Sequence, residues 1–214
     1  MKFPLHLING YIHEEDKKKL RKLSKKERKK QILEQAILFF AREGYDKADL
    51  SKLAQELGIG KGTIYRHFSS KQNLFFAAVD LGMVRLKESI DQAAEKESDP
   101  LYRIQKAIEA YLTFFSKHPE FVELFIQERA YFPHREKATY FIHREQNIEK
   151  WRKLLEELIH QKIFRPLPIE ETLDIMGDLL YGTIFSNFLA KREKDPQEQA
   201  RLIWDLTLKG LLQK

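Results

Sequence analysis

The chain has 214 residues, of which 43% are hydrophobic, and this content supports a packed core of one or two domains. It contains no cysteine, which excludes a disulfide framework, a thiol nucleophile and a cysteine metal site. The net charge of +6 is uneven, because residues 1–75 carry 17 Lys/Arg against 9 Asp/Glu while residues 76–214 carry 21 against 23. Such a basic amino-terminal part suits a polyanionic partner.

Residues 1–23 are predicted to form a basic extension ahead of the first helix. A basic run begins in this segment, with ten Lys/Arg and one acid from Lys17 to Lys30. One interpretation is a solvated, partly frayed segment. The other is an arm that neutralises phosphates or enters a minor groove, and the two are compatible because such arms often order only on binding. No apolar run approaches the roughly 20 residues of a membrane span, and the first residues lack a signal-peptide core, so we expect a cytoplasmic protein.

The first helix is predicted to start at Ser24, which forms an S-x-x-E capping box with Glu27. Apolar residues then recur on one helical face up to Phe40, and Gly44 ends the helix. A second capping box, predicted from Ser69 and Gln72, would open a long helix that runs toward residue 96.

The stretch between these helices reads LSKLAQELGIGKGTIYRHF, residues 50–68, and predicts two short helices joined at Gly58. Gly58 can adopt a positive φ and turn the chain sharply. The second segment keeps Ile64 and Phe68 for the core and leaves basic and hydrogen-bonding side chains on its free edge. This arrangement is typical of a helix-turn-helix that reads the DNA major groove.

The outward side chains of this segment have the chemistry that base and phosphate contacts require. Arg66 can pair bidentately with guanine, and Thr63 can touch a thymine methyl group or a phosphate. Lys71, in the first turn of the next helix, can meet a phosphate with help from the positive end of that helix. The alternatives are that Tyr65 is a half-buried aromatic bridging two helices and that Arg66 and Lys71 are solvated charges.

Residues 26–80 resemble the amino-terminal DNA-binding domain of the TetR family of bacterial transcriptional regulators. The resemblance rests on the Ala36 and Phe40 stripe, the Gly44-Tyr45 turn, Leu53-Ala54, Gly58, the run from Lys61 to Tyr65, Phe68 and Lys71. The chain departs from the family at Ala48 and Asp49, where Thr and Ser are usual, at Leu57 and at Gly60. The resemblance implies that Tyr65 and His67 contact phosphates and bases, and the expected DNA-contacting set is Ser51, Lys61, Thr63, Tyr65, Arg66, His67 and Lys71.

Beyond residue 96 the chain predicts a series of helices whose starts are marked by proline. Asp99-Pro100, Pro119, Pro168 and Asp195-Pro196 each open one, since proline suits the first helical turn. Pro133 precedes a single long helix that carries residues 141–158. We therefore expect an all-α protein of about nine helices, with an extension at 1–23, a three-helix helix-turn-helix DNA-binding domain at 24–70 and a helical ligand-binding and dimerisation domain at 71–214.

Residues 111–151 are dense in aromatic side chains. Ordinary helical core is one interpretation of this density. In the TetR family, however, the corresponding region surrounds a cavity for an apolar or amphipathic small molecule, and a mixed lining suits such a ligand. The resemblance therefore implies a ligand-binding set made of Phe125, Arg129, Tyr131, Tyr140, His143 and Tyr181.

Residues 169–191 and 196–213 carry apolar stripes wider than a monomer surface needs, and Gly177, Gly182 and Ser186 allow close helix approach. Internal packing is one explanation. The resemblance implies the other, that these two helices pack against a second copy in a homodimer. Two reading heads about one DNA turn apart (roughly 34 Å) would then recognise a near-palindromic operator.

The sequence favours a one-component DNA-binding regulator, in which a small apolar or amphipathic effector releases a repressor from double-stranded operator DNA. The alternative is a non-regulatory helical protein that binds nucleic acid or a partner without a specific operator. We expect no enzyme activity, no cofactor and no metal, because the seven histidines form no metal-ligand motif and no nucleophile lies in a recognisable elbow.

Overall fold

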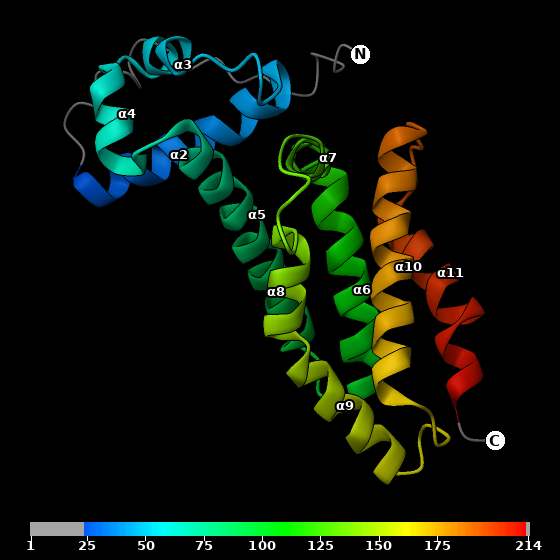
Figure 1. The fold of residues 1–214 in the computed structure, drawn as a ribbon. Helices are drawn as coiled ribbons and strands as arrows, with labels where there is room; N and C mark the ends of the chain where they lie inside the picture. The colour runs from blue at the N-terminus through cyan, green and yellow to red at the C-terminus, as the bar shows by residue number, and fades with distance from the viewer. Residues whose placement is uncertain (1–23, 213–214) are drawn as a thin grey trace. The chain divides into compact units, whose positions relative to one another are not determined.

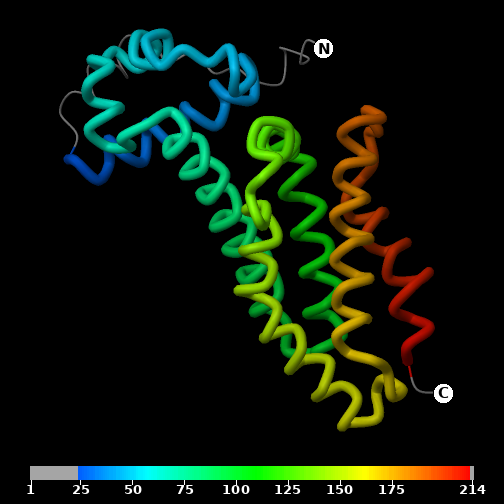
Figure 2. The backbone as a smooth tube through the Cα atoms, in the orientation of Figure 1, coloured from blue at the N-terminus to red at the C-terminus, as the bar shows by residue number. Residues whose placement is uncertain are grey.

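The computed structural model describes residues 24–212 as an all-α protein whose backbone forms two compact units. Of the described residues, the first unit contains 24–82 together with Glu123–Thr139, and the second contains Met83–Val122 and 140–212. Figures 1 and 2 show the helices in order along the chain. The predicted basic extension at 1–23 lies outside the described residues. The division by contacts differs from the predicted boundary at residue 70, because residues 71–82 pack with the amino-terminal unit.

The amino-terminal unit is built from α2 (Lys25–Glu43), α3 (Leu50–Leu57), α4 (Lys61–Phe68), the first half of α5 (Lys71–Ala94) and most of α7 (Glu120–Tyr131). Apolar residues at helical spacing meet in its core, where Phe40, Leu53, Ile64 and Phe75 are fully buried. Ion pairs fasten α2 to α3, since Arg42 Nη2 lies 2.5 Å from Glu56 Oε1 and Lys52 Nζ lies 2.8 Å from Glu43 Oε1.

The start of α2 follows the capping chemistry predicted from the sequence, whereas the cap of α5 is shifted by one residue. Ser24 and Glu27 form the predicted capping box. The predicted box at Ser69 and Gln72 is wrong, because Ser69 ends α4 with φ 58°. Ser70 takes the capping role for α5 instead, and its Oγ accepts a hydrogen bond from the Asn73 amide at 3.0 Å.

The connection after α7 is held by the buried carboxylate of Glu128, which is 2% exposed. Its Oε1 accepts hydrogen bonds from the Thr139 amide at 2.9 Å and the Thr139 hydroxyl at 2.8 Å, and it pairs with the Arg135 guanidinium. The same guanidinium lies over the Phe76 ring, 4.3 Å from its centroid. Because Glu128 supplies an acceptor for the Thr139 amide, α8 (Thr139–Asn147) begins there.

The second unit contains α6 (Pro100–Lys117), α9 (Glu149–His160), α10 (Ile169–Leu189), α11 (Pro196–Leu206) and the short 3₁₀ helix η2 (Leu208–Leu211). Within it α11 lies against α6, and α10 lies against α6 and α9 (Figures 1 and 2). Asp99 and Asp195 cap α6 and α11 as predicted, each ahead of a proline. An isolated bridge joins Phe164 to Leu212.

The prediction of a single long helix after Pro133 is wrong. Turns occupy residues 133–138, and the helical segment that follows is divided at Ile148 into α8 and α9. The Asn147 side chain donates to the His143 carbonyl at 2.7 Å, a local bond of the kind that competes with the helical ladder. Among the helices that the structure describes, none is long and apolar enough to cross a membrane.

Candidate nucleic-acid interface and ligand cavity

Helix α4 divides its side chains between the core and the surface as the motif predicts. Ile64 and Phe68 are buried, whereas Lys61, Tyr65 and Arg66 are exposed. Tyr65 is 41% exposed, so part of its side chain is open to solvent. The outer edge of α4 is therefore free to approach a flat or grooved partner.

The turn into α4 has the geometry of a helix-turn-helix. Gly58 adopts the left-handed conformation with φ 64° and ψ 30°, and its amide bonds to the carbonyls of Ala54 and Gln55. Gly60 precedes α4 without a side-chain cap, so no hydroxyl satisfies the first amides of the helix. A shallow hollow opens beside these amides, lined by Gly58–Gly60, Thr63 and Arg28 of α2.

The other two residues of the expected DNA-contacting set lie outside α4. Ser51 is exposed in the first turn of α3, where its amide bonds to Asp49 Oδ1 at 2.8 Å. Lys71 Nζ donates to the Asp46 carbonyl at 3.0 Å and lies 4.8 Å from the centroid of the Tyr45 ring. Partial burial lowers the pKa of Lys71. Both residues belong to the same compact unit as α4.

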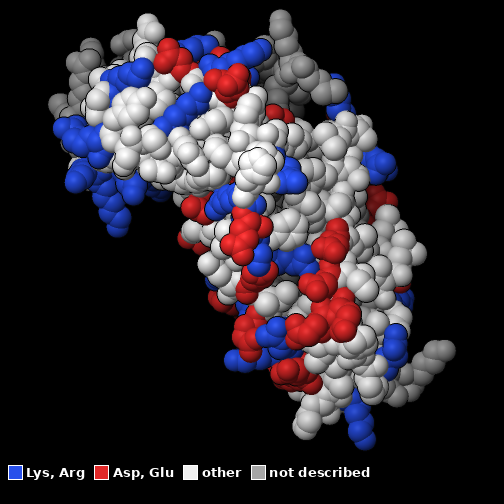
Figure 3. Space-filling model, viewed as in Figure 1, with Lys and Arg blue, Asp and Glu red and all other residues white. Residues whose placement is uncertain are grey.

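His67 lies in a strongly cationic environment. Burial first, and then the charges of Arg66, Lys25, Arg28 and Lys29, lower the pKa of the His67 imidazole. Three of these cations come from α2, and Figure 3 shows Lys and Arg gathered around α4 and the start of α2. The expected DNA-contacting set omitted these α2 residues, although the basic run that ends at Lys30 was a signal for them.

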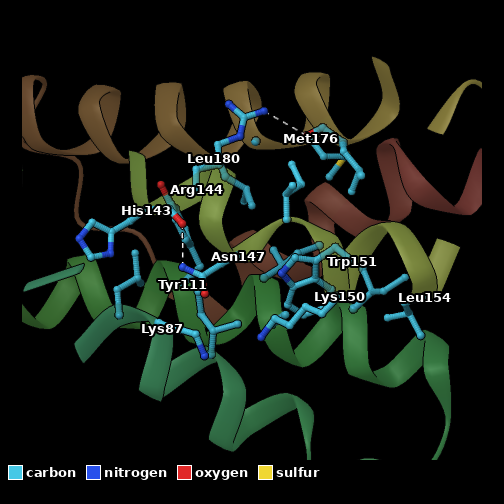
Figure 4. Close-up of a pocket in the computed structure, with 18 of the residues that line it drawn as sticks. Lys87, Tyr111, His143, Arg144, Asn147, Lys150, Trp151, Leu154, Met176 and Leu180 are labelled. Atoms are coloured by element: carbon cyan, nitrogen blue, oxygen red, sulfur yellow. Dashed lines mark hydrogen bonds between the residues drawn. The ribbon is translucent and has the colours of Figure 1, made fainter. Parts of the chain in front are cut away.

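The second unit contains a cavity of about 210 Å³ between α5, α6, α8, α9 and α10 (Figure 4). Most of its lining is apolar, as expected for a small-molecule site. Two hydroxyls meet at this cavity, since Tyr111 and Tyr140 both line it and their oxygens lie 2.9 Å apart. Burial raises the pKa of Tyr140 to about 12 and also raises that of Tyr111, so both phenols are neutral hydrogen-bonding groups near pH 7.

The structure separates the six residues of the expected ligand-binding set. Tyr140 and His143 line the cavity, and the Tyr181 ring packs against Tyr140 with centroids 4.5 Å apart. Phe125, Arg129 and Tyr131 are not part of its lining, because α7 from Glu123 onward packs with the amino-terminal unit. Arg129 is exposed and donates to the Pro133 carbonyl at 2.7 Å, whereas its neighbour Glu128 is buried and pairs with the partly exposed Arg135.

The polar lining of the cavity includes residues that the aromatic density did not indicate. Lys87 and Asp91 come from α5, and Lys150 comes from α9. These three positions are scattered among ordinary charged helical surface, so no local pattern marked them. Only the packing of α5 against α9 brings them to one cavity.

Arg144 of α8 forms one wall of the cavity and is bound by α10. Its guanidinium bonds to the carboxylates of Asp174 and Asp178 at 3.0 and 2.9 Å and to the Asp174 carbonyl at 3.0 Å. Gly177 makes room for it, because a Cβ at this position would lie 2.6 Å from Arg144 Nε. The sequence predicts that Gly177 allows the close approach of another helix, and in this unit the group that approaches it is the Arg144 side chain.

A sequence model described as bacterial regulatory proteins of the tetR family matches residues 32–78, which include α3, α4 and the turn between them. The solved structure of the TetR family transcriptional regulator PfmR from Thermus thermophilus is 27% identical, with a TM-score of 0.68, and the match covers 85% of this chain and 98% of that one.

Two curated relatives match less than half of this chain. The transcriptional activator FasR of Mycolicibacterium smegmatis is 32% identical over 44% of this chain and 42% of its own length. The nucleoid occlusion factor SlmA of Vibrio vulnificus is 30% identical over 45% of this chain and 50% of its own. The chain thus spans half or less of the length of these two proteins.

Proposed function

This chain belongs to the TetR family of bacterial regulatory proteins, and we propose that it is a homodimeric, one-component transcriptional repressor that a small amphipathic ligand releases from its operator. The observation that carries the proposal is the pairing of two features in one chain. The first is a short helix that presents Lys61, Tyr65 and Arg66 outward beside the basic start of α2. The second is a mainly apolar cavity in the other compact unit. Its DNA partner would place the protein in the cytoplasm.

The proposed DNA contacts divide by chemistry. Arg66 would read a base edge in the major groove, because a guanidinium matches the two acceptors of guanine. Lys61, Thr63, Tyr65, His67 and Ser51 would surround it with phosphate and base contacts. Lys71 would position the unit on the phosphate backbone, as would Arg28 beside the uncapped start of α4.

The proposed dimer uses the exposed face of α10 together with α11. Ile175, Leu179 and Leu189 are 67%, 36% and 61% exposed in the single chain, and Gly182 and Ser186 lie between them at alternating steps of four and three residues. This spacing is that of a seam between packed helices. The two small residues would let the helices approach closely. Leu202 and Leu206 of α11, which are 44% and 82% exposed, would extend the seam.

The proposed release mechanism is a population shift. The ligand would favour a conformation in which the two α4 helices are wrongly spaced for the operator, so ligand affinity and operator affinity would be coupled with opposite sign. The boundary between the two compact units falls inside α5, so one continuous helix joins the cavity-lining residues from Met83 onward to residues 71–82 of the amino-terminal unit along the chain.

The experiment that tests this proposal is a footprint of the purified protein on DNA upstream of its own gene, repeated at increasing salt. We expect a protected near-palindrome with half-sites about one turn apart, and loss of that protection in Arg66→Ala. Glu136→Ala, which changes an exposed residue distant in sequence from α4, is the matched control. Added ligand that binds the cavity without altering protection would contradict the release mechanism.

A second candidate function is DNA binding that does not regulate transcription, and the match to a nucleoid occlusion factor favours considering it. Such a protein would bind many sites and would leave transcription of the adjacent gene unchanged. A reporter gene placed behind the footprinted site distinguishes the two, because a repressor lowers its expression. One relative is a transcriptional activator, so the sign of the reporter response also distinguishes repression from activation.

A further inference from the structure

The charged groups around the cavity of the second unit are gathered at one place. Asp91 of α5 lies in ion-pair contact with two ammonium groups, that of Lys87 on the same helix and that of Lys150 on α9. All three residues belong to the lining of the cavity (Figure 4). Two cations share one carboxylate, so this cluster, which we call the Lys87–Asp91–Lys150 cluster, has a net charge of +1.

The cluster lies where the cavity meets solvent. The side chains of Lys87 and Lys150 are 47% and 40% exposed, whereas that of Asp91 is only 19% exposed. Figure 4 shows both lysines extending along the same side of the cavity. The ammonium groups are thus reachable by a ligand whose remainder occupies the apolar interior, and the carboxylate lies behind them.

No other charged side chain of the described lining supplies a comparable site. Arg144 is bound by two carboxylates of α10, and the lining contributions of α6 and α10 carry no charge. The remaining titratable groups are His143, Tyr111 and Tyr140, and both phenols are held neutral by burial. Within the described lining, the surplus ammonium of the cluster is therefore the positive charge that no carboxylate balances.

We propose that the ligand of this cavity is an amphipathic anion, whose negatively charged head group binds Lys87 and Lys150 and whose slim apolar body fills the interior. This inference rests on the proposed function, because it assigns a chemical class to the effector. A neutral ligand would leave the surplus charge uncompensated, and a cationic ligand would be repelled by it. The volume of about 210 Å³ lies below the roughly 300–1,000 Å³ typical of pockets for drug-sized ligands, which favours a slender body.

Two features of α9 support the head-group site. Burial, and then the neighbouring Lys87 charge, lower the pKa of Lys150, so an incoming anion would relieve a repulsion that exists in the free protein. The Lys150 ammonium also lies 4.7 Å from the centroid of the Trp151 ring, and Trp151 lines the same cavity. Trp151 is therefore placed to report on a ligand that binds Lys150.

The test compares three probes with one tail, namely decanoate, decanol and decyltrimethylammonium, in calorimetric titrations of the full chain below their micelle concentrations. We expect decanoate to bind at least about tenfold more tightly than decanol, and the cation most weakly. Equal affinities for decanoate and decanol would overturn the proposal, and so would the absence of decanoate binding. Decyl phosphate, tested beside decanoate, distinguishes a phosphate head group from a carboxylate.

Substitutions of the lysines and of the aspartate in the cluster should change the affinity for decanoate in opposite directions. Lys87→Gln and Lys150→Gln should each weaken decanoate about three- to fivefold, as expected for a half-exposed charge pair, and should leave decanol unchanged. Asp91→Asn should tighten decanoate, because it removes the competing carboxylate. Lys153→Gln on the exposed side of α9 is the matched control. If the lysine substitutions lower thermal stability but do not change decanoate affinity, the cluster is only a structural ion pair and the proposal is wrong.

The same probes keep this inference separate from the proposed function. Decanoate that binds through the cluster but leaves the operator footprint intact would refute release by ligand while supporting the head-group site. If the protein forms the operator footprint but does not bind decanoate, the head-group site is refuted and the proposed DNA-binding regulator is not.

Discussion

His67 is a residue of α4 whose charge depends on its partner. In the free protein, burial and the cations of Arg66 and α2 lower its pKa, so the imidazole is neutral near pH 7. Phosphates of bound DNA would compensate these cations and raise the pKa. Between the two pKa values the complex would hold a proton that the free protein lacks.

We therefore predict that operator affinity rises as the pH falls through this window. The sign follows from linkage, because the state that binds more protons is favoured at lower pH. Below the lowered pKa of the free protein both states are protonated, and the pH dependence should level off. Fluorescence anisotropy with labelled operator between about pH 8 and 5.5 measures the effect, and His67→Gln should remove most of it. An unchanged slope in that variant would show that another group takes up the proton.

Substitutions of Arg66 and Lys71 are predicted to change DNA binding in different ways. Arg66→Ala should lose discrimination at one base position by roughly 1–3 kcal/mol, because it would remove the proposed bidentate base contact. Lys71→Ala should weaken all sequences alike and reduce the salt slope by about 1, because it would remove the proposed phosphate contact. Binding to a set of single-base operator variants at several salt concentrations separates the two. Circular dichroism of Lys71→Ala checks that loss of the bond to the Asp46 carbonyl has not unfolded the turn.

At the scale of elements, α8 is fastened to α10 by Arg144, which fits only because position 177 is glycine. In the wild-type background, Gly177→Ala should lower stability by about 0.5–1.5 kcal/mol, because the new methyl group displaces a guanidinium with several hydrogen bonds. In an Arg144→Ala background the same change should stabilise by up to ~1 kcal/mol, since alanine is the better helix former. Urea unfolding at one fixed protein concentration completes this double-mutant cycle. Additive effects would mean that the side chain does not occupy this space.

Helix α10 carries exposed apolar residues that no other described part of the single chain covers. If a dimer covers Leu179 and Ile175, it stabilises the folded protomer, so the free energy of unfolding should increase with protein concentration.

At the scale of the whole molecule, we predict that Leu179→Glu converts a dimer to a monomer. A charge at the centre of the proposed seam would be buried without a partner, at a cost of several kcal/mol. Sedimentation equilibrium measures the outcome, and Gln146→Glu at an exposed position of α8 is the charge-matched control. Loss of the dimer should also lower operator affinity, because one reading head replaces two. A Leu179→Glu variant that stays dimeric would place the interface elsewhere.

Much of the fold followed from the sequence because its signals are local. The capping box at Ser24, the left-handed turn at Gly58 and the aspartates that precede Pro100 and Pro196 are set by hydrogen bonds within a few residues. The two local errors have local causes as well. Ser69 and Ser70 are adjacent candidates for one cap, and a single side-chain bond from Asn147 accompanies the division of α8 from α9.

The candidate site divides in the same way. By itself the sequence determined which side chains α4 presents outward and which it buries, because helical periodicity decides this from one segment. Only the tertiary structure decided that the end of α7 packs with the amino-terminal unit and that Lys87, Asp91 and Lys150 share one cavity. The physical reason is that contacts between segments far apart in sequence depend on the packing of whole helices, and periodicity within one helix specifies its apolar face but not the helix that covers it.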